Sequence, residues 1–338
     1  MPIKRLEGKE TLISTSKKDK GKWLEFEGNY YYVVRDNQDF SRILQLEHCF
    51  SSLITTYVSN MSRMYKYIWN LKTFNEPLNS WDVSKVENMS YMFHGCSLFN
   101  QPLDQWDVSK VKDMSYMFAG CSTFDQPLNS WDVSRVRKMN YMFNQCSSFN
   151  QPLDQWNVSK VDNISDMFYE CSSFNQPLNS WNVSSVKHMI GVFRKCSSFN
   201  QPLNSWDVSN IEMMNCVFQD CFSFNQDINS WNVKNVKNMI CMFGGCSSFN
   251  QPLNSWDVSK VEIMKGMFYG CSSFNQPLNS WNVSKVRDMS YMFHGCQKFN
   301  QPLDQWDVSK MKDMRCMFYN CERFHQPLEQ WDISKFKK

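Results

Sequence analysis

Residues 249–261 read FNQPLNSWDVSKV and residues 274–286 read FNQPLNSWNVSKV, so nearly the same stretch returns 25 positions later. The same step carries a phenylalanine column from Phe74 to Phe324 and a cysteine column from Cys96 to Cys321. An unbroken period of this length is typical of stacked-repeat proteins, in which each repeat buries its apolar face against its neighbours. The repeat therefore decides the fold, and the rest of the chain is interpreted around it.

A single repeat, residues 74–98, combines two apolar spacings. Residues 81–83 alternate between apolar and polar side chains, which indicates a short strand. From Val86 onward the apolar residues are three or four positions apart, which indicates one face of a helix, with Ser84 placed to cap it. These helical positions are Val86, Met89, Phe93 and Cys96. We therefore predict an α/β repeat solenoid with one short strand and one short helix per 25-residue coil.

Stacking has two further consequences. Parallel strands about 4.8 Å apart on one side, with bulkier helices on the other, predict a stack that curves into an arc. A polar side chain that recurs beside a core position needs hydrogen-bond partners, so the asparagines near the start of each repeat predict a ladder that bonds the backbone between coils. These asparagines include Asn75, Asn100, Asn150 and Asn175.

The segment WDVSKVENMSYMFHGCSLFNQPL, residues 81–103, resembles the repeat of the BspA-like leucine-rich-repeat proteins. The closest similarity is to the subgroup found in mycoplasma surface lipoproteins, other bacterial surface proteins and some large DNA viruses. The shared motifs are W-[DN]-V-S, M-F-x-x-C and F-N-Q-P-L, and they cover residues 74–338. The resemblance implies a leucine-rich-repeat-like right-handed arc that binds proteins or host surfaces.

The chain outside the regular repeats predicts additional parts. We expect residues 1–21 to be mobile, residues 22–48 to form a hairpin and helix that cap the array, and residues 49–73 to be a degenerate first repeat in which Val58 corresponds to Val83. Ten full repeats follow over residues 74–323, and residues 324–338 form a truncated last repeat. Because that last repeat lacks its second half, we expect its open end to be covered by a second subunit or by the partner.

Composition limits the partners. The net charge is +3, from 36 basic and 33 acidic residues, which does not favour a nucleic-acid partner. Neither a signal peptide nor a membrane span is evident, so we expect an intracellular or virion-associated protein, with surface display only if a leader is missing. Ten of the 14 cysteines share one column, and we predict that they are buried free thiols.

No residue pattern predicts catalysis, a cofactor or a metal site. The five histidines are not spaced as metal ligands, and cysteines five positions apart, such as Cys216 and Cys221, diverge on a helix. The tryptophan column is in phase with the core, so it is predicted to be buried rather than to stack sugars or bases. One polar column is basic in seven of ten coils; it is either a solvated ridge or a track for an anionic polymer. Its basic members are Lys85, Lys110, Arg135, Lys160, Lys260, Lys285 and Lys310.

We therefore expect a non-enzymatic scaffold that mediates protein–protein interaction. The alternatives are a structural or assembly component, for example in a virion, or an adhesin-like surface protein whose export signal is absent from this sequence. Apolar residues replace polar ones on the outer surface of the middle coils, through repeat drift or as a contact patch of Ile190, Met213, Ile240 and Ile263. Candidate contacts on the predicted strand face are Asp82, Asp107, Asp132, Asp207, Asp257 and Asp307.

Overall fold

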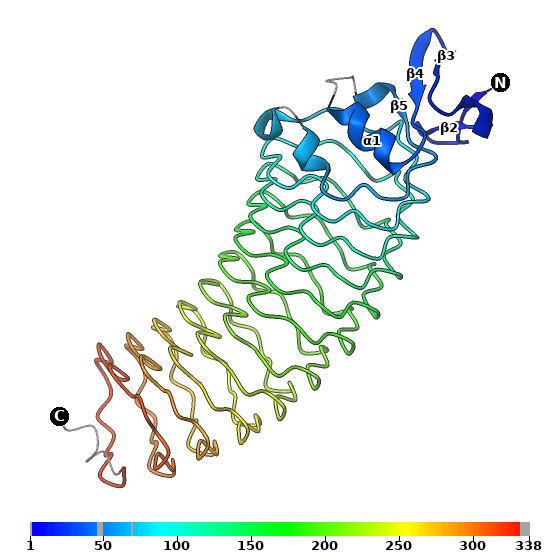
Figure 1. The fold of residues 1–338 in the computed structure, drawn as a ribbon. Helices are drawn as coiled ribbons and strands as arrows, with labels where there is room; N and C mark the ends of the chain where they lie inside the picture. The colour runs from blue at the N-terminus through cyan, green and yellow to red at the C-terminus, as the bar shows by residue number, and fades with distance from the viewer. Residues whose placement is uncertain (1, 46–49, 69, 332–338) are drawn as a thin grey trace. The chain divides into compact units, whose positions relative to one another are not determined.

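The computed structural model describes residues 2–45, 50–68 and 70–331 (Figure 1). These residues form two compact units, which divide between Val161 and Asp162. The first unit contains an amino-terminal region followed by coils, and the second consists of coils. The coils of both units have the same local structure, which confirms a repeat solenoid.

The amino-terminal region is built on two small sheets. Strand β1 (Ile3–Arg5) pairs with β2 (Leu12–Ser14) in an antiparallel hairpin. In the second sheet, β4 (Asn29–Val33) pairs antiparallel with β3 (Trp23–Phe26) and parallel with β5 (Leu53–Ile54). The hairpin β3–β4 lies where the sequence predicts one.

Residues 1–21 were expected to be mobile, and of these the structure describes residues 2–21, which include a β-hairpin. Ile3 and Leu12 are buried against Val33 and Ile54, so the β1–β2 hairpin supplies part of the core of this region. A 3-10 helix, η1 (Lys17–Asp19), follows. The scattered charges of this segment concealed the two apolar residues that anchor it.

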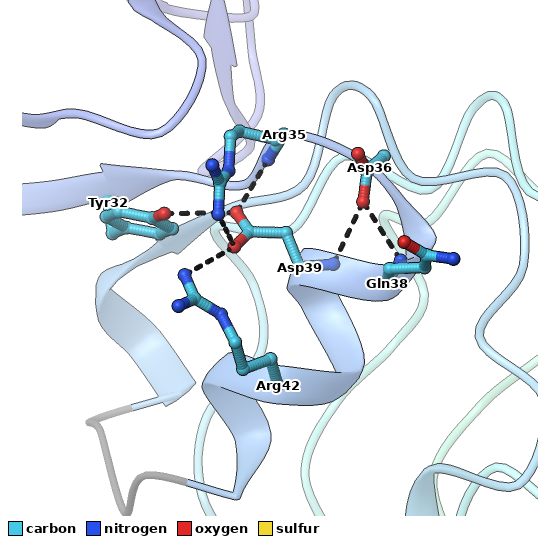
Figure 2. Close-up of polar contacts among 6 residues, drawn as sticks. All are labelled: Tyr32, Arg35, Asp36, Gln38, Asp39 and Arg42. Carbon is cyan, nitrogen blue, oxygen red and sulfur yellow. Dashed lines mark hydrogen bonds and ion pairs between the residues drawn. The ribbon is translucent and has the colours of Figure 1, made fainter.

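Helix α1 (Asn37–Leu44) begins at Asp36, whose carboxylate accepts hydrogen bonds from two backbone N–H groups of the first turn. Asp39 is buried in the same turn, where Tyr32 and Arg35 reach it from outside the helix and Arg42 reaches it from the next turn (Figure 2). Its carboxylate accepts from Tyr32 Oη at 3.0 Å, Arg35 Nη2 at 2.8 Å and Arg42 Nη2 at 2.9 Å. This cluster fixes α1 beside β4.

The degenerate repeat contains three short 3-10 helices: η2 (Phe50–Ser52), η3 (Met64–Tyr67) and η4 (Leu71–Thr73). Equivalent positions in this repeat and the next coil are 28 residues apart, not 25, since Asn60 forms a parallel bridge with Asn88. Val58 therefore corresponds to Val86, and both close a turn onto the residue three positions earlier. The predicted match of Val58 with Val83 is wrong by three positions.

The prediction of one strand and one helix per coil is also wrong. Between residues 74 and 331, the described chain has isolated parallel bridges and turns but no regular helix or extended strand. Each turn is closed by a hydrogen bond from a backbone N–H to the carbonyl three residues earlier, as from Trp81 to Leu78 (3.0 Å), Val86 to Val83 (2.9 Å) and Met92 to Met89 (3.2 Å). The first and last residues of these turns are buried and apolar. Apolar residues three positions apart therefore indicate turns in this chain, not a helix.

Backbone groups that a helix would use internally are bonded to the next coil instead. The N–H groups of Met89, Tyr91 and Phe93 donate to carbonyls one coil further on, at 2.9, 2.9 and 2.8 Å. Tyr91 and Gly95 have left-handed backbones, with φ of 58° and 80°, which a right-handed helix excludes. These alternate inter-coil bonds explain why the helix does not form.

The tryptophan column is buried, as predicted. The rings of neighbouring coils are parallel, with centroids 6.4 Å apart between Trp206 and Trp231. Each indole also satisfies its N–H inside the stack, as when Trp206 Nε1 donates to the carbonyl of Leu178 at 2.9 Å. This column is therefore core, and its faces are covered by other rings.

The cysteine column and the asparagine ladder are also confirmed. All ten column cysteines are buried and free, and Cys196 Sγ donates to the Phe168 carbonyl at 2.8 Å. Burial raises the pKa of the Cys196 thiol well above its usual range, so it stays protonated. In the ladder, Asn175 Oδ1 accepts from the backbone N–H of Asn200 at 2.9 Å. Polar and sulfur side chains thus join one coil to the next.

Candidate interaction surface

The inter-coil bridges lie in a surface column that holds a turn-capping side chain in most coils. Asn238 Oδ1 accepts from the N–H of Ile240 at 3.0 Å, and Asp288 Oδ1 accepts from Ser290 at 2.9 Å. Met213 and Ile263 occupy this column in the second unit and have no oxygen to accept such a bond. Each gives up a hydrogen bond worth about 1 kcal/mol and leaves an apolar side chain at a surface position.

Met213 lines a surface hollow of about 690 Å³ in the second unit. The hollow arises where the basic column is interrupted, because Ser185 and Asn210 stand where Lys or Arg stands in most other coils. Asn210 is also folded back, with Nδ2 donating to the Ser184 carbonyl at 2.8 Å. The lining residues are Asp162, Ser184, Ser185, Lys187, His188, Asn210, Glu212 and Met213.

Met213 is the apolar residue among the eight that line the hollow, and the other seven are polar or charged. Met213 is 42% exposed, which is unusual for a methionine in a chain whose core takes up most of the others. Around it, His188, Lys187 and Glu212 are exposed, and Glu212 forms an ion pair with Lys237 at 2.7 Å. The lining of the hollow therefore combines both signs of charge and hydrogen-bonding groups with one apolar side chain.

The predicted apolar patch lies on this side of coils five to eight, counted from residue 74. Met213 is exposed, and Ile190, Ile240 and Ile263 are half-buried. Met213 and Ile263 flank Asn238, since each forms a parallel bridge with it. Polar residues, Asn238 among them, separate the apolar ones, so the patch is discontinuous.

The six candidate aspartates do not lie on a strand, because residues 81–83 and the equivalent residues of the other described coils form no strand. Asp82 is buried, and the other five are exposed. Each carboxylate accepts from the serine N–H two positions later, as Asp207 does from Ser209 at 3.0 Å. The hydrogen bonds from Ser209 lower the pKa of Asp207. These carboxylates therefore cap a turn.

Sequence reasoning missed Phe222, which is 50% exposed beside a second hollow of about 550 Å³. Glu170 and Lys195 line the same hollow and form an ion pair at 2.6 Å. Asp220 also lines it, and burial raises the pKa of its carboxyl. The signal was present in the repeat, because Phe222 occupies a column that is serine in most other coils.

The described residues lack two further features. No three His, Cys, Asp or Glu side chains converge as metal ligands would. None of the described helices has the length and hydropathy needed to cross a bilayer.

Comparison with known proteins identifies the repeat. Residues 36–156, 100–201, 138–256 and 237–338 each match the family model described as "Mycoplasma protein of unknown function, DUF285". No curated protein matches. Among solved structures, a leucine-rich repeat protein from Bacteroides ovatus is 14% identical, with 96% of this chain and 98% of that chain covered and a TM-score of 0.26. A TLR13–ssRNA13 complex is 8% identical, with 87% and 49% covered and a TM-score of 0.26. These TM-scores are too low for either structure to inform the arrangement of the coils.

Proposed function

The chain belongs to the DUF285 family, and we propose that it is a non-enzymatic repeat scaffold that binds another protein through the surface around Met213. The proposal includes the narrower kinship with the BspA-like leucine-rich-repeat proteins, whose repeat motif this chain resembles. The partner's contact is an apolar side chain that enters the hollow, surrounded by polar groups that meet its rim.

Met213 carries this proposal. It replaces a capping side chain, so its position reduces local stability without adding to the core. An exposed apolar residue with a polar rim is the usual composition of a protein–protein contact. Two changes in neighbouring coils, Ser185 and Asn210, open the space beside it.

The non-enzymatic part of the proposal rests on how the reactive side chains are used. The aspartates at the Asp82 position and its equivalents cap turns. The column thiols donate hydrogen bonds inside the core, where burial raises the pKa of Cys271 and its neighbours. In these columns the groups that could act as acid, base or nucleophile hold the coils together.

The proposal is tested by charging the apolar contact. The double variant Met213→Glu and Ile263→Glu is compared with Leu98→Glu, which places a single glutamate on an exposed apolar residue in the first unit. Partners captured from the native source are identified by mass spectrometry, purified, and measured against each variant by calorimetry. We expect the double variant to weaken binding at least tenfold and Leu98→Glu to leave it unchanged.

Near-ultraviolet circular dichroism should be the same for all three proteins, because none of the changes touches the core. Equal binding by wild type and the double variant would remove this surface from the proposal. Light scattering of the wild type and the double variant tests the alternative, an assembly component. If the double variant disrupts only a self-associated form, the chain is such a component.

A further inference from the structure

One surface column changes its character between the two units. In the first unit it holds Tyr91, Tyr116 and Tyr141, whose rings stack with centroids 4.3 and 4.4 Å apart. In the second unit the column loses these rings over five coils. It reads Asp166, Gly191, Cys216, Cys241 and Gly266. Both cysteines are half-buried, in contrast to the core thiols.

Cys216 and Cys241 are neighbours on consecutive rungs. Their backbone N–H groups donate to Ile240 and Lys265, each one coil further on, at 2.8 and 2.9 Å. Coils paired in this way are about 4.8 Å apart, which is within the Cα separation of roughly 4.4–6.8 Å that a disulfide spans. The two side chains therefore occupy the same column on adjacent coils.

Gly266 leaves room for the Cys241 thiol. A Cβ on Gly266 would lie 3.1 Å from Cys241 Sγ, so the thiol uses space that any other residue would restrict. The column holds no aromatic side chain from Asp166 to Gly266, whereas Tyr116 occupies it in the first unit, and both thiols are partly exposed. Small reagents can therefore reach this pair, which they cannot do in the buried cysteine column.

The two thiols differ in acidity. Interaction with the adjacent Cys216 thiol lowers the pKa of the Cys241 thiol to about 7, with further lowering by Lys265 and Arg194, although burial opposes it. The same interaction between the two thiols, together with burial, raises the pKa of Cys216. Cys241 therefore provides the thiolate and Cys216 the neighbouring protonated thiol.

We propose that Cys216 and Cys241 form a redox-sensitive dithiol that a hydroperoxide converts to a disulfide between coils six and seven. The Cys241 thiolate attacks the terminal peroxide oxygen, the O–O bond breaks, and the alcohol leaves with a proton, which gives a sulfenic acid. Cys216 sulfur then attacks the Cys241 sulfur, the S–O bond breaks, and the hydroxide leaves as water with the Cys216 proton. Two thiols lose two electrons and the hydroperoxide gains them.

The test uses the full-length protein and tert-butyl hydroperoxide under native conditions. After alkylation of the remaining thiols and proteolysis, mass spectrometry should find one peptide pair joined through Cys216 and Cys241, lighter by two hydrogens and separated by dithiothreitol. In the reduced protein, iodoacetamide should label Cys241 at least tenfold faster than any thiol of the buried column.

Cys316 is the matched control, because it occupies the same column and is exposed, with Tyr291 in the preceding coil. Cys316→Ser should keep the cross-link, whereas Cys216→Ser and Cys241→Ser should each abolish it while keeping the wild-type circular dichroism spectrum. Oxidation of Cys316 without a Cys216–Cys241 cross-link would overturn the proposal. So would equal labelling rates for Cys241 and the buried thiols.

Discussion

Tyr91 has a left-handed backbone, with φ of 58°, and the equivalent position is left-handed in the coils that follow it. Side chains as different as Tyr116, Asp166 and Cys216 occupy this position, although most L-residues pay about 1–2 kcal/mol for the conformation. The turn geometry of the coil imposes it, since the adjacent N–H groups are bonded to the next coil. At the residue scale, the backbone at this position is therefore decided by inter-coil hydrogen bonds, and residue identity does not reveal it.

Gly270 allows this backbone to be tested directly. Its φ is 69°, and the nearest atoms to an added Cβ are 3.8 Å away, so substitution meets no steric obstacle. Gly270→Ala should destabilise the protein by about 1 kcal/mol, because only the left-handed conformation is penalised. In a helix interior the same change would stabilise by about 1 kcal/mol. Thermal unfolding measures the sign, and Gly270→Asn should cost less than Gly270→Ala, because asparagine tolerates this region.

At the element scale, the period and the buried columns could be predicted because they depend only on spacing. The turns could not, since apolar residues three apart fit both a helix face and residues that bracket a β-turn. Val86, Met89 and Cys96 satisfy either reading, and only the inter-coil bonds of residues such as Phe93 decide between them. The contact patch was located from substitutions within a column. The hollow beside Met213 depends on how Asn210 folds back, which spacing does not encode.

Asp39 makes helix α1 sensitive to acid. Burial works to raise its pKa, but hydrogen bonds from Arg35, Arg42 and Tyr32 outweigh burial and hold the pKa of the carboxyl well below its usual range. A lowered folded-state pKa contributes stability that is complete above the unfolded value of about 3.9 and is lost as the pH falls below it. Asp39→Asn should cost about 3 kcal/mol at pH 7, as for one partner of a buried ion cluster.

The difference between wild type and Asp39→Asn should shrink steadily between about pH 5 and pH 2, because Asp39 becomes protonated in the unfolded chain while it stays ionised in the folded protein. Hydrogen-exchange protection of α1 in urea measures it, with Glu25→Gln, an exposed carboxylate on β3, as the control. A difference that stays constant over this range would show that the cluster is not ionised in the folded protein.

At the scale of the whole molecule, the described coils within each unit are joined to the next by the same four kinds of contact. Backbone ladders, asparagine Oδ1 atoms, indole N–H groups and cysteine thiols each reach one coil away, as with Asn250 to Asn275, Trp281 to Leu253 and Cys271 to Phe243. The contacts of these kinds that the described coils make all end in a neighbouring coil. Stability should therefore be a sum of coil and nearest-neighbour terms, so the coil is the unit that can be removed.

Deletion of residues 274–298 removes one complete coil and joins Ser273 to Phe299. The remaining coils can renew every contact, because Asn300 then meets Asn250 and Trp306 meets Leu253, in the places of Asn275 and Trp281. We expect a folded protein with a slightly smaller denaturant m-value and an unchanged near-ultraviolet spectrum per tryptophan. Deletion of residues 274–286 is the control: it removes fewer residues but leaves a coil without its Leu278 and Trp281 positions. It should expose tryptophan and lose protection from residue 287 onward. Equal stability of the two deletions would contradict the additive stack, because the contacts between coils require the 25-residue spacing.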